Sequence, residues 1–257
     1  MENRKNTILL TVIAVATLLV AVVGATFAYF TAQGGGSDNT QINVKTSTSS
    51  NSSFQLGATL DINANQENFD TLESTHRTDT QTGTVSWTPS NQASGENLNF
   101  CYSVNLNVTT NTFEYIDEEV RSEAQVAGTT IDESWDNTPE LVFTITKNSN
   151  PITEGITGLN YETVDTSKTG GSRPEVSGWD ITEWGSTGAA SVVIPGNSTN
   201  KQYHQISGTA GQASTDNWSI TATLINLDVD QQHNTNKTFA GTLVFAQVKC
   251  TDGSPIA

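Results

Sequence analysis

Alternation of apolar and polar residues is clearest between Leu98 and Val108. Every second residue is apolar, and the residues between them are mostly asparagine and serine. A period of two over this length predicts a β-strand with one face in a core and the other toward solvent. Shorter apolar-rich segments predict further strands at 54–62, 84–87, 141–145, 191–194, 218–227 and 239–248. Polar turns separate these segments, so we expect an all-β fold, an antiparallel β-sandwich.

Two segments depart from the strand pattern. Residues 116–124 carry a short helical pattern, and the acids Asp117, Glu118 and Glu119 lie where a helix N-terminus favours negative charge. Residues 148–190 are rich in glycine, threonine and serine, which predicts a long loop or hairpin. Trp179 and Trp184 near its end are expected to pack onto the sandwich; binding of a sugar or a neighbouring molecule is the alternative.

The first thirty residues have the layout of an export signal. A basic start with Arg4 and Lys5 precedes an uncharged run, and short residues follow up to Ala28. The 16 residues from Ile8 to Val23 span about 24 Å as a helix, less than the roughly 30 Å hydrocarbon core of a bilayer. We therefore expect cleavage after Ala28, with a membrane anchor extending to Phe30 as the alternative.

Four parts follow from these patterns. Residues 1–28 form a signal peptide or a retained anchor, and residues 29–53 form a flexible N-terminal arm with glycines at 34–36 and a Thr/Ser/Asn tract. Residues 54–250 form the β-sandwich domain, and residues 251–257 form a C-terminal tail. An exported chain of this kind is secreted or held at the cell surface.

The negative net charge argues against a nucleic-acid partner. The chain has 27 Asp and Glu against 11 Lys and Arg, a formal net charge of −16. Binding to the phosphates of a nucleic acid requires clustered Lys and Arg, so no nucleic-acid partner is expected. Contact with a membrane is expected only through the N-terminal helix, if it is not cleaved.

The two cysteines, Cys101 and Cys250, are expected to form one disulfide in an oxidising compartment, with two free thiols as the alternative. Cys101 belongs to the polar positions of its strand, so the bond would join surface positions of neighbouring strands.

The sequence shows no specific sign of catalysis. Its three histidines, His76, His204 and His233, have no zinc-ligand spacing and are expected on the surface. No Gly-x-Ser-x-Gly elbow is present. We therefore expect a protein that is not an enzyme and that needs no cofactor, with calcium as the one exception to consider.

Calcium is considered because four oxygen-bearing side chains cluster in one turn. They are Asp228, Asp230, Asn234 and Asn236. Calcium prefers such hard oxygen ligands. The alternative is a turn without metal, because Asn and Asp side chains also bond to their own backbone.

Two stretches resemble the TasA/camelysin family of exported bacterial proteins. The first is residues 24–31, Gly-Ala-Thr-Phe-Ala-Tyr-Phe-Thr, which is similar to the end of that family's signal peptide. The second resembles the family's closing hairpin and comprises Asp230-Gln231-x-x-Asn234, Lys237-Thr238-Phe239-x-Gly241 and Leu243-x-Phe245-Ala246-Gln247.

The resemblance implies a sandwich of jelly-roll type and a structural subunit of an extracellular, biofilm-matrix or cell-surface fibre. In such fibres the N-terminal strand of one subunit completes a sheet of the next, so the chain would be its own partner, together with other matrix components. The β-prone residues of the arm are Tyr29, Phe30, Ile42 and Val44. Three alternatives remain: an arm that folds back onto its own sandwich or stays disordered, a monomeric membrane-anchored or secreted adhesin or carbohydrate-binding module, and a camelysin-like metalloprotease.

Overall fold

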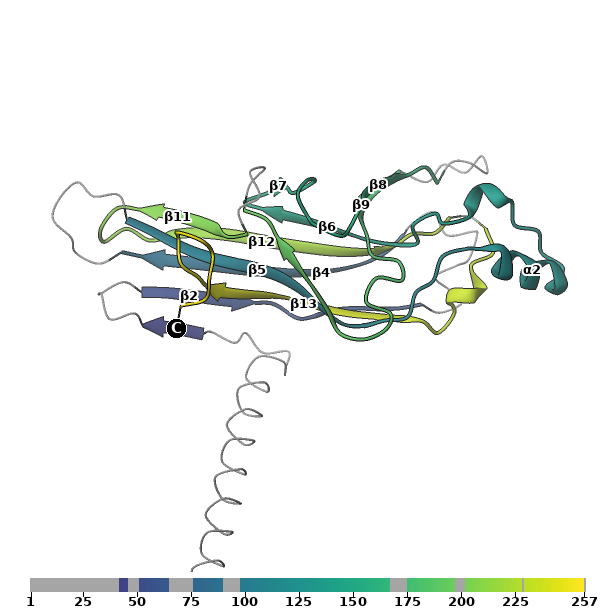
Figure 1. The fold of residues 1–257 in the computed structure, drawn as a ribbon, viewed down its shortest axis with the longest axis horizontal. Helices are drawn as coiled ribbons and strands as arrows, with labels where there is room; N and C mark the ends of the chain where they lie inside the picture. Colours follow the sequence, from purple (N-terminus) through teal and green to yellow (C-terminus); the bar gives the residue numbers. More distant parts are fainter. Residues whose placement is uncertain are drawn as a thin grey trace, which may run out of the picture. The chain divides into compact units, whose positions relative to one another are not determined.

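Two antiparallel sheets make up the part of the chain that the structure describes (Figure 1). The structure is a computed structural model, and it describes residues 42–45, 51–64, 76–89, 98–166, 175–196, 202–227 and 229–256. The two antiparallel sheets confirm the expected all-β sandwich.

The larger sheet has eight described strands, of which seven follow the order β1-β2-β4-β12-β6-β9-β8, while β7 pairs with β6. Its long central strands are β4 and β12, which pair over eleven residues from Ser214 opposite Trp87 to Leu224 opposite Arg77. The strands are β1 (Ile42–Lys45), β2 (Asn51–Leu56), β4 (Arg77–Thr88), β6 (Leu141–Lys147), β7 (Asn150–Pro151), β8 (Tyr161–Val164), β9 (Val176–Asp180) and β12 (Ser214–Leu224).

The smaller sheet has five described strands, with the order β10-β5-β13-β3. Its longest strand, β5, contains the alternating segment of the sequence. Two short strands share the same side of β5: β10 pairs with 104–108 and β11 pairs with 98–102. The strands are β3 (Leu60–Asn63), β5 (Leu98–Asn111), β10 (Ala190–Ile194), β11 (His204–Gly208) and β13 (Thr238–Gln247).

The core lies between the two sheets. Tyr102, Val104 and Leu106 of β5 are fully buried, as their period of two predicts. Aromatic rings meet across the layers, with Phe54 of β2 6.1 Å from Phe245 of β13 and Trp87 of β4 5.9 Å from Phe100 of β5, measured between ring centroids.

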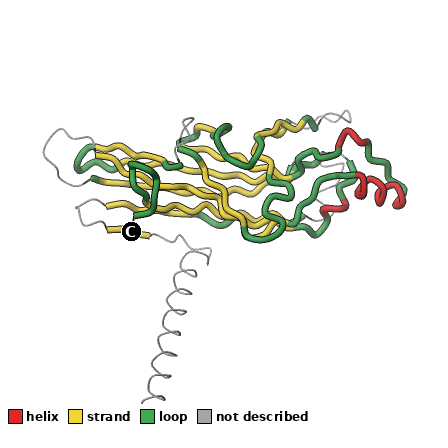
Figure 2. Tube along the Cα trace, viewed as in Figure 1, coloured by secondary structure: helices red, strands yellow, loops and turns green. Residues whose placement is uncertain are grey.

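Helical segments gather at one end of the strands (Figure 2). The expected helix is α2 (Glu118–Ala127), and η2 (Glu133–Trp135) and η3 (Gln232–Asn234) are single 3-10 turns. Asp117 caps α2, because its Oδ1 accepts the backbone N–H of Val120 at 2.9 Å. Gly128 ends it with φ 94°, a left-handed conformation that glycine adopts without strain.

The larger sheet also includes residues that were expected in the flexible arm. β1 lies wholly within residues 29–53, and β2 begins at Asn51, three residues before the expected start of the domain. Ile42 of β1 lies opposite Phe54, and Val44 lies opposite Ser52. The serine-rich residues at 51–53 extend the ladder because their backbone groups pair with β4 whatever their side chains are.

The expected signal segment 1–28 lies outside the described residues, as do Tyr29 and Phe30. Within the described part of the chain, no helix has the length and apolar character needed to cross a membrane. The C-terminal tail turns back along the end of β13, where Val248 forms an isolated bridge with Pro255.

Candidate functional site

The outer side of β10 is an open strand edge. Val192 lies opposite Leu106 of β5, which lies opposite Leu243 of β13. The N–H of Leu243 donates to Gln81 Oε1 at 2.7 Å, on the side of β13 that faces away from β5. In an antiparallel pair, two opposite residues either bond to each other or both point away, so the backbone of Leu106 points away from β13, toward β10, and bonds to Val192. Backbone groups alternate sides along a strand, so those of Ser191 and Val193 point outward. No described strand pairs with β10 on that side.

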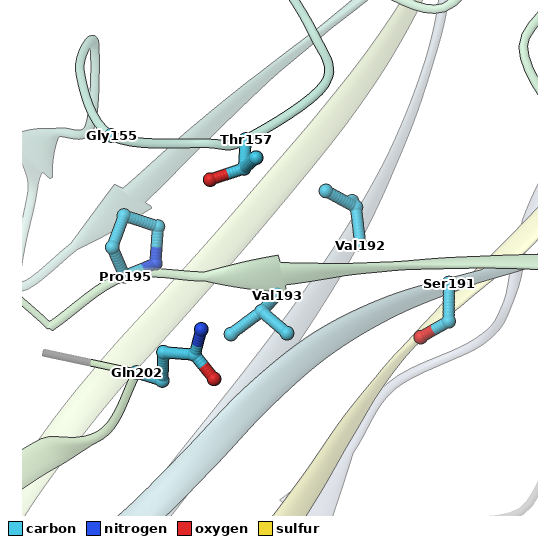
Figure 3. Close-up of a pocket in the computed structure, with 7 residues that line it drawn as sticks. All are labelled: Gly155, Thr157, Ser191, Val192, Val193, Pro195 and Gln202. Carbon is cyan, nitrogen blue, oxygen red and sulfur yellow. The ribbon is translucent and has the colours of Figure 1, made fainter. Parts of the chain in front are cut away.

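A groove of about 390 Å³ runs beside this edge (Figure 3). One wall is formed by residues 191–193 of β10 itself, and the others come from loops. Figure 3 shows Thr157 on the same side of the strand as Val192, and Gln202 on the side of Val193. The lining residues are Gly155, Thr157, Ser191, Val192, Val193, Pro195 and Gln202. Two outward backbone positions facing a groove can accept an additional strand.

The donor-arm residues Ile42 and Val44 lie in β1, the edge strand of the larger sheet. β1 pairs with β2 over four residues and has no other strand neighbour among the described residues. In a single chain this part of the arm therefore folds back, which is one of the expected arrangements. The expected cleavage position, Ala28, is outside the described residues.

The expected calcium ligands use several of their polar atoms within the protein. Asn234 is fully buried; its Oδ1 accepts the N–H of Glu114 at 3.0 Å, and its Nδ2 donates to the carbonyl of Glu114 at 2.9 Å. Asp230 Oδ1 accepts the N–H of Gln232 at 3.1 Å. Asn236 has φ 64° and continues the turn. Asp228 lies outside the described residues, and calcium binding at this turn stays a prediction.

Glu140 forms a buried polar centre that sequence reasoning missed. Its side chain is fully buried and accepts three hydrogen bonds at the end of the sandwich that carries η3. Gln231 Nε2 donates at 2.6 Å, Asn234 Nδ2 at 2.8 Å and His233 Nε2 at 2.9 Å. A buried carboxylate is stable only with such partners. The one feature of the sequence that could have indicated this centre is that Gln231, His233 and Asn234 lie close together in one turn.

Asp216 of β12 anchors a second polar centre. It is nearly buried, and its Oδ2 accepts the hydroxyl of Tyr102 at 2.6 Å, while Lys147 Nζ lies 2.8 Å from the same oxygen. Asn148 Nδ2 donates to Oδ1 at 2.8 Å. The indole N–H of Trp218 donates to the hydroxyl of Tyr102 at 3.1 Å. Burial, followed by the bond to Asp216, raises the pKa of Tyr102.

The prediction of surface histidines is wrong for two of the three. His204 is 2% exposed and stacks on Tyr102 with ring centroids 5.4 Å apart. His233 has a side chain 6% exposed and pairs with Glu140. Both lie in polar stretches of the sequence, and the partners that bury them come from distant parts of the chain.

Trp179 and Trp184 pack against the core, as expected. Trp179 is 3% exposed, and its indole N–H donates to the carbonyl of Ile152 at 2.8 Å. Trp184 is partly buried against the same cluster. Neither ring forms the exposed platform that the sugar-binding alternative for this loop needs.

The disulfide between Cys101 and Cys250 is confirmed. Cys101 lies on the outer side of β5, yet it is only 2% exposed, because Tyr203, Val248 and Cys250 pack around it. The hydroxyl of Tyr203 donates to the carbonyl of Cys250 at 2.7 Å. The bond therefore fastens the C-terminal tail to the smaller sheet.

Comparisons with known proteins leave the family of this chain open. No family model, no curated protein and no solved structure matches it. Within the described residues, no three His, Cys, Asp or Glu side chains are grouped to hold a metal ion.

Proposed function

We propose that this chain is an exported structural subunit of an extracellular matrix or cell-surface fibre. Subunits assemble head to tail, and each donates its N-terminal strand to a sandwich of jelly-roll type in the next subunit. The partner is a second copy of the chain, together with other matrix components. The proposal rests on the resemblance of residues 24–31 and 230–247 to an exported fibre-forming family, and it assigns no catalytic step.

The open edge of β10 is the observation that carries this proposal. Ser191 and Val193 each present an outward N–H and C=O beside a groove of about 390 Å³. Val193 is 36% exposed, so part of its apolar surface is available to a partner. An added strand gains a ladder of main-chain hydrogen bonds there, each worth about 0.5–1.5 kcal/mol net.

The donor is the segment that contains β1. Its four-residue ladder with β2 is short, so its exchange for an equivalent ladder in a neighbouring subunit changes the free energy little. Donation from one subunit to a different surface of the next is a heterologous contact, which generates open filaments.

A proline substitution on the outward edge tests the acceptor. Val193→Pro removes one outward N–H but keeps the inward bonds of Val192 and Ile194, and proline is tolerated at an edge strand. Gln205→Pro is the matched control, because Gln205 faces outward on β11, opposite Cys101, and does not line the groove. We expect negative-stain microscopy to show filaments of the wild type and of Gln205→Pro, and monomers of Val193→Pro.

Shortening the chain tests the donor. A chain that starts at Asn51 keeps all of β2 and lacks β1. We expect it to fold, as judged by near-ultraviolet circular dichroism, and to sediment as a monomer. Filaments of this shorter chain contradict strand donation, and monomeric wild-type protein at every concentration contradicts the fibre proposal as a whole.

A further inference from the structure

The outer face of the larger sheet carries hydroxyl groups across four adjacent strands, β2, β4, β12 and β6. Residues such as Val85 and Ile220 point into the core, so the residues that alternate with them point outward. The outward positions are every second residue of 53–55, 80–86, 215–221 and 144–146. Ten of these twelve residues are threonine or serine, and the other two are Gln55 and Asn217. Together they form the hydroxyl face.

Strand pairing arranges the hydroxyl face in rows. Thr80 lies opposite Thr221, which in turn lies opposite Thr144. The hydroxyl oxygens of Thr80 and Thr221 are 2.8 Å apart, and those of Ser86 and Thr215 are 2.9 Å apart. Because these bonds join neighbouring strands, they hold the side chains in place before any partner arrives. Little side-chain freedom is therefore left to lose on association.

The hydroxyl face is uncovered and uncharged. None of its twelve residues is buried, and none is acidic or basic. The whole chain has a formal net charge of −16, so this neutral area contrasts with the rest of the molecule. Two copies that meet through acidic surfaces bring like charges together, which opposes association. At the hydroxyl face the same two copies approach without opposing charges at the contact.

A face of hydroxyl groups is complementary to itself. Each hydroxyl both donates and accepts hydrogen bonds, so two identical faces can satisfy each other, unlike two faces of carboxylates. Twisted sheets also pack face to face readily, with their strands about 30° from alignment. We propose that the hydroxyl face packs against the same face of a second copy and joins filaments side by side. This inference rests on the fibre function proposed above.

The size of the face makes each contact weak. Four strands and seven residues cover about 20 Å by 20 Å, so a pair buries about 800 Å², less than the roughly 1,200–2,000 Å² of stable complexes. Isolated subunits therefore stay monomeric at micromolar concentration. A filament presents one such face in every subunit, and many weak contacts then act together.

Negative-stain microscopy of filaments tests the lateral contact. We expect the wild type to form bundles of two or more filaments and Thr82→Glu to form single filaments, because it places a carboxylate on both sides of the contact. Thr109→Glu is the matched control, since it makes the same change at an exposed threonine of β5 in the smaller sheet, and we expect it to form bundles. Bundles of Thr82→Glu as wide as those of the wild type overturn the proposal.

Salt distinguishes this contact from one between opposite charges. Screening weakens the repulsion between the acidic subunits, so we expect wild-type bundles to widen as the salt concentration rises from about 0.01 M to about 1 M. Bundles that separate into single filaments over this range indicate pairing of opposite charges and overturn the proposal.

Nuclear magnetic resonance separates this inference from the fibre function. The full-length Val193→Pro chain is expected not to polymerise, so its faces can be observed in solution. We expect the amide resonances of 80–86 and 215–221 to shift as its concentration rises to about 1 mM, the weak end of the affinity scale, and adding Thr82→Glu to this chain to remove the shifts. Resonances that do not shift overturn the pairing of hydroxyl faces. Absence of wild-type filaments contradicts the fibre function instead, and this measurement still decides whether the faces pair.

Discussion

Nε2 of His233 lies 2.9 Å from Oε1 of Glu140, and the two side chains are only 6% and 0% exposed. The pair joins η3 to the start of β6, positions 93 residues apart in the chain. Gln231 and Asn234 bond to the other carboxylate oxygen, so Glu140 ties the turn before β13 to the larger sheet. This end of the sandwich thus depends on charge and hydrogen bonds as well as on apolar packing.

The stability of the protein is expected to fall as the pH rises above neutrality. Burial lowers the pKa of His233, but the hydrogen bond and charge of Glu140, with a smaller contribution from Glu114, raise the net value above the ordinary 6.5. A group whose pKa is higher in the folded than in the unfolded state stabilises the fold fully at pH values below its unfolded pKa. This stabilisation is lost as the pH rises through the folded pKa. Urea unfolding between about pH 6 and pH 9 measures this trend.

His233→Gln is the control for the pH dependence, because it removes the titrating group and keeps a hydrogen-bond donor. We expect its free energy of unfolding to show no such fall between about pH 7 and pH 9. The same slope in His233→Gln and in the wild type assigns the trend to another group. His204 acts in the opposite sense, since burial lowers its pKa to about 4; its contribution is complete well above the ordinary value of 6.5 and is lost as the pH falls from there toward 4.

Removal of the Glu140 carboxylate is expected to be strongly destabilising. Glu140→Ala leaves three donors without their acceptor in a buried site. Loss of one partner of a buried ion pair costs about 3–5 kcal/mol of unfolding free energy. Glu123→Ala on the exposed side of α2 is the matched control, with an expected change within about 0.5 kcal/mol. Equal urea midpoints for the two variants contradict the role given to Glu140.

Tyr102→Phe tests how much the second polar centre, around Asp216, contributes to stability. The phenylalanine keeps the ring packing but leaves Asp216 without one donor and the indole N–H of Trp218 without its acceptor. We expect a loss of about 1–3 kcal/mol in the free energy of unfolding, measured by urea denaturation. Tyr161→Phe serves as the control, because its partly exposed ring packs edge-on against Trp179. A smaller effect for Tyr102→Phe than for Tyr161→Phe contradicts this interpretation.

Reduction of the disulfide is expected to destabilise the protein substantially. Cys101 and Cys250 are 149 residues apart, and the chain-entropy model gives about 5 kcal/mol as the upper estimate for such a loop. We expect the double variant Cys101→Ser/Cys250→Ser to unfold at lower urea concentration and to be insensitive to dithiothreitol. Wild-type protein with the same midpoint in the presence and absence of dithiothreitol contradicts a stabilising disulfide.

The secondary structure was largely predictable because it depends on local pattern. Alternation over Leu98–Val108 identified β5, and the acidic start after Ile116 identified α2. The disulfide was predictable for a simpler reason, since the chain contains two cysteines. The start of β2 at Asn51 was missed, because the polar side chains of residues 51–53 hide backbone pairing.

The polar centres were not predictable from the same patterns. His204 and His233 follow polar loops, and their environment comes from Tyr102, Trp218 and Glu140, which lie far from them in the chain. Of the expected calcium ligands, Asn234 faces inward to Glu114 and Glu140, a direction that spacing does not encode.

By itself, the sequence determined the strands with a clear apolar pattern, which are β5, β6, β10, β12 and β13, because side-chain alternation is a property of neighbours along the chain. It did not predict β8, β9 and β11, and the apolar run at 54–62 is divided between β2 and β3 of different sheets. The tertiary structure alone decided which strand edges stay open and which polar side chains become buried. Among the described strands, none pairs with the outer side of β10, and His204 is buried because the pairing of β11 with β5 brings it against Tyr102 and Trp218. Both outcomes depend on contacts between residues distant in sequence, which form only when the two sheets pack together.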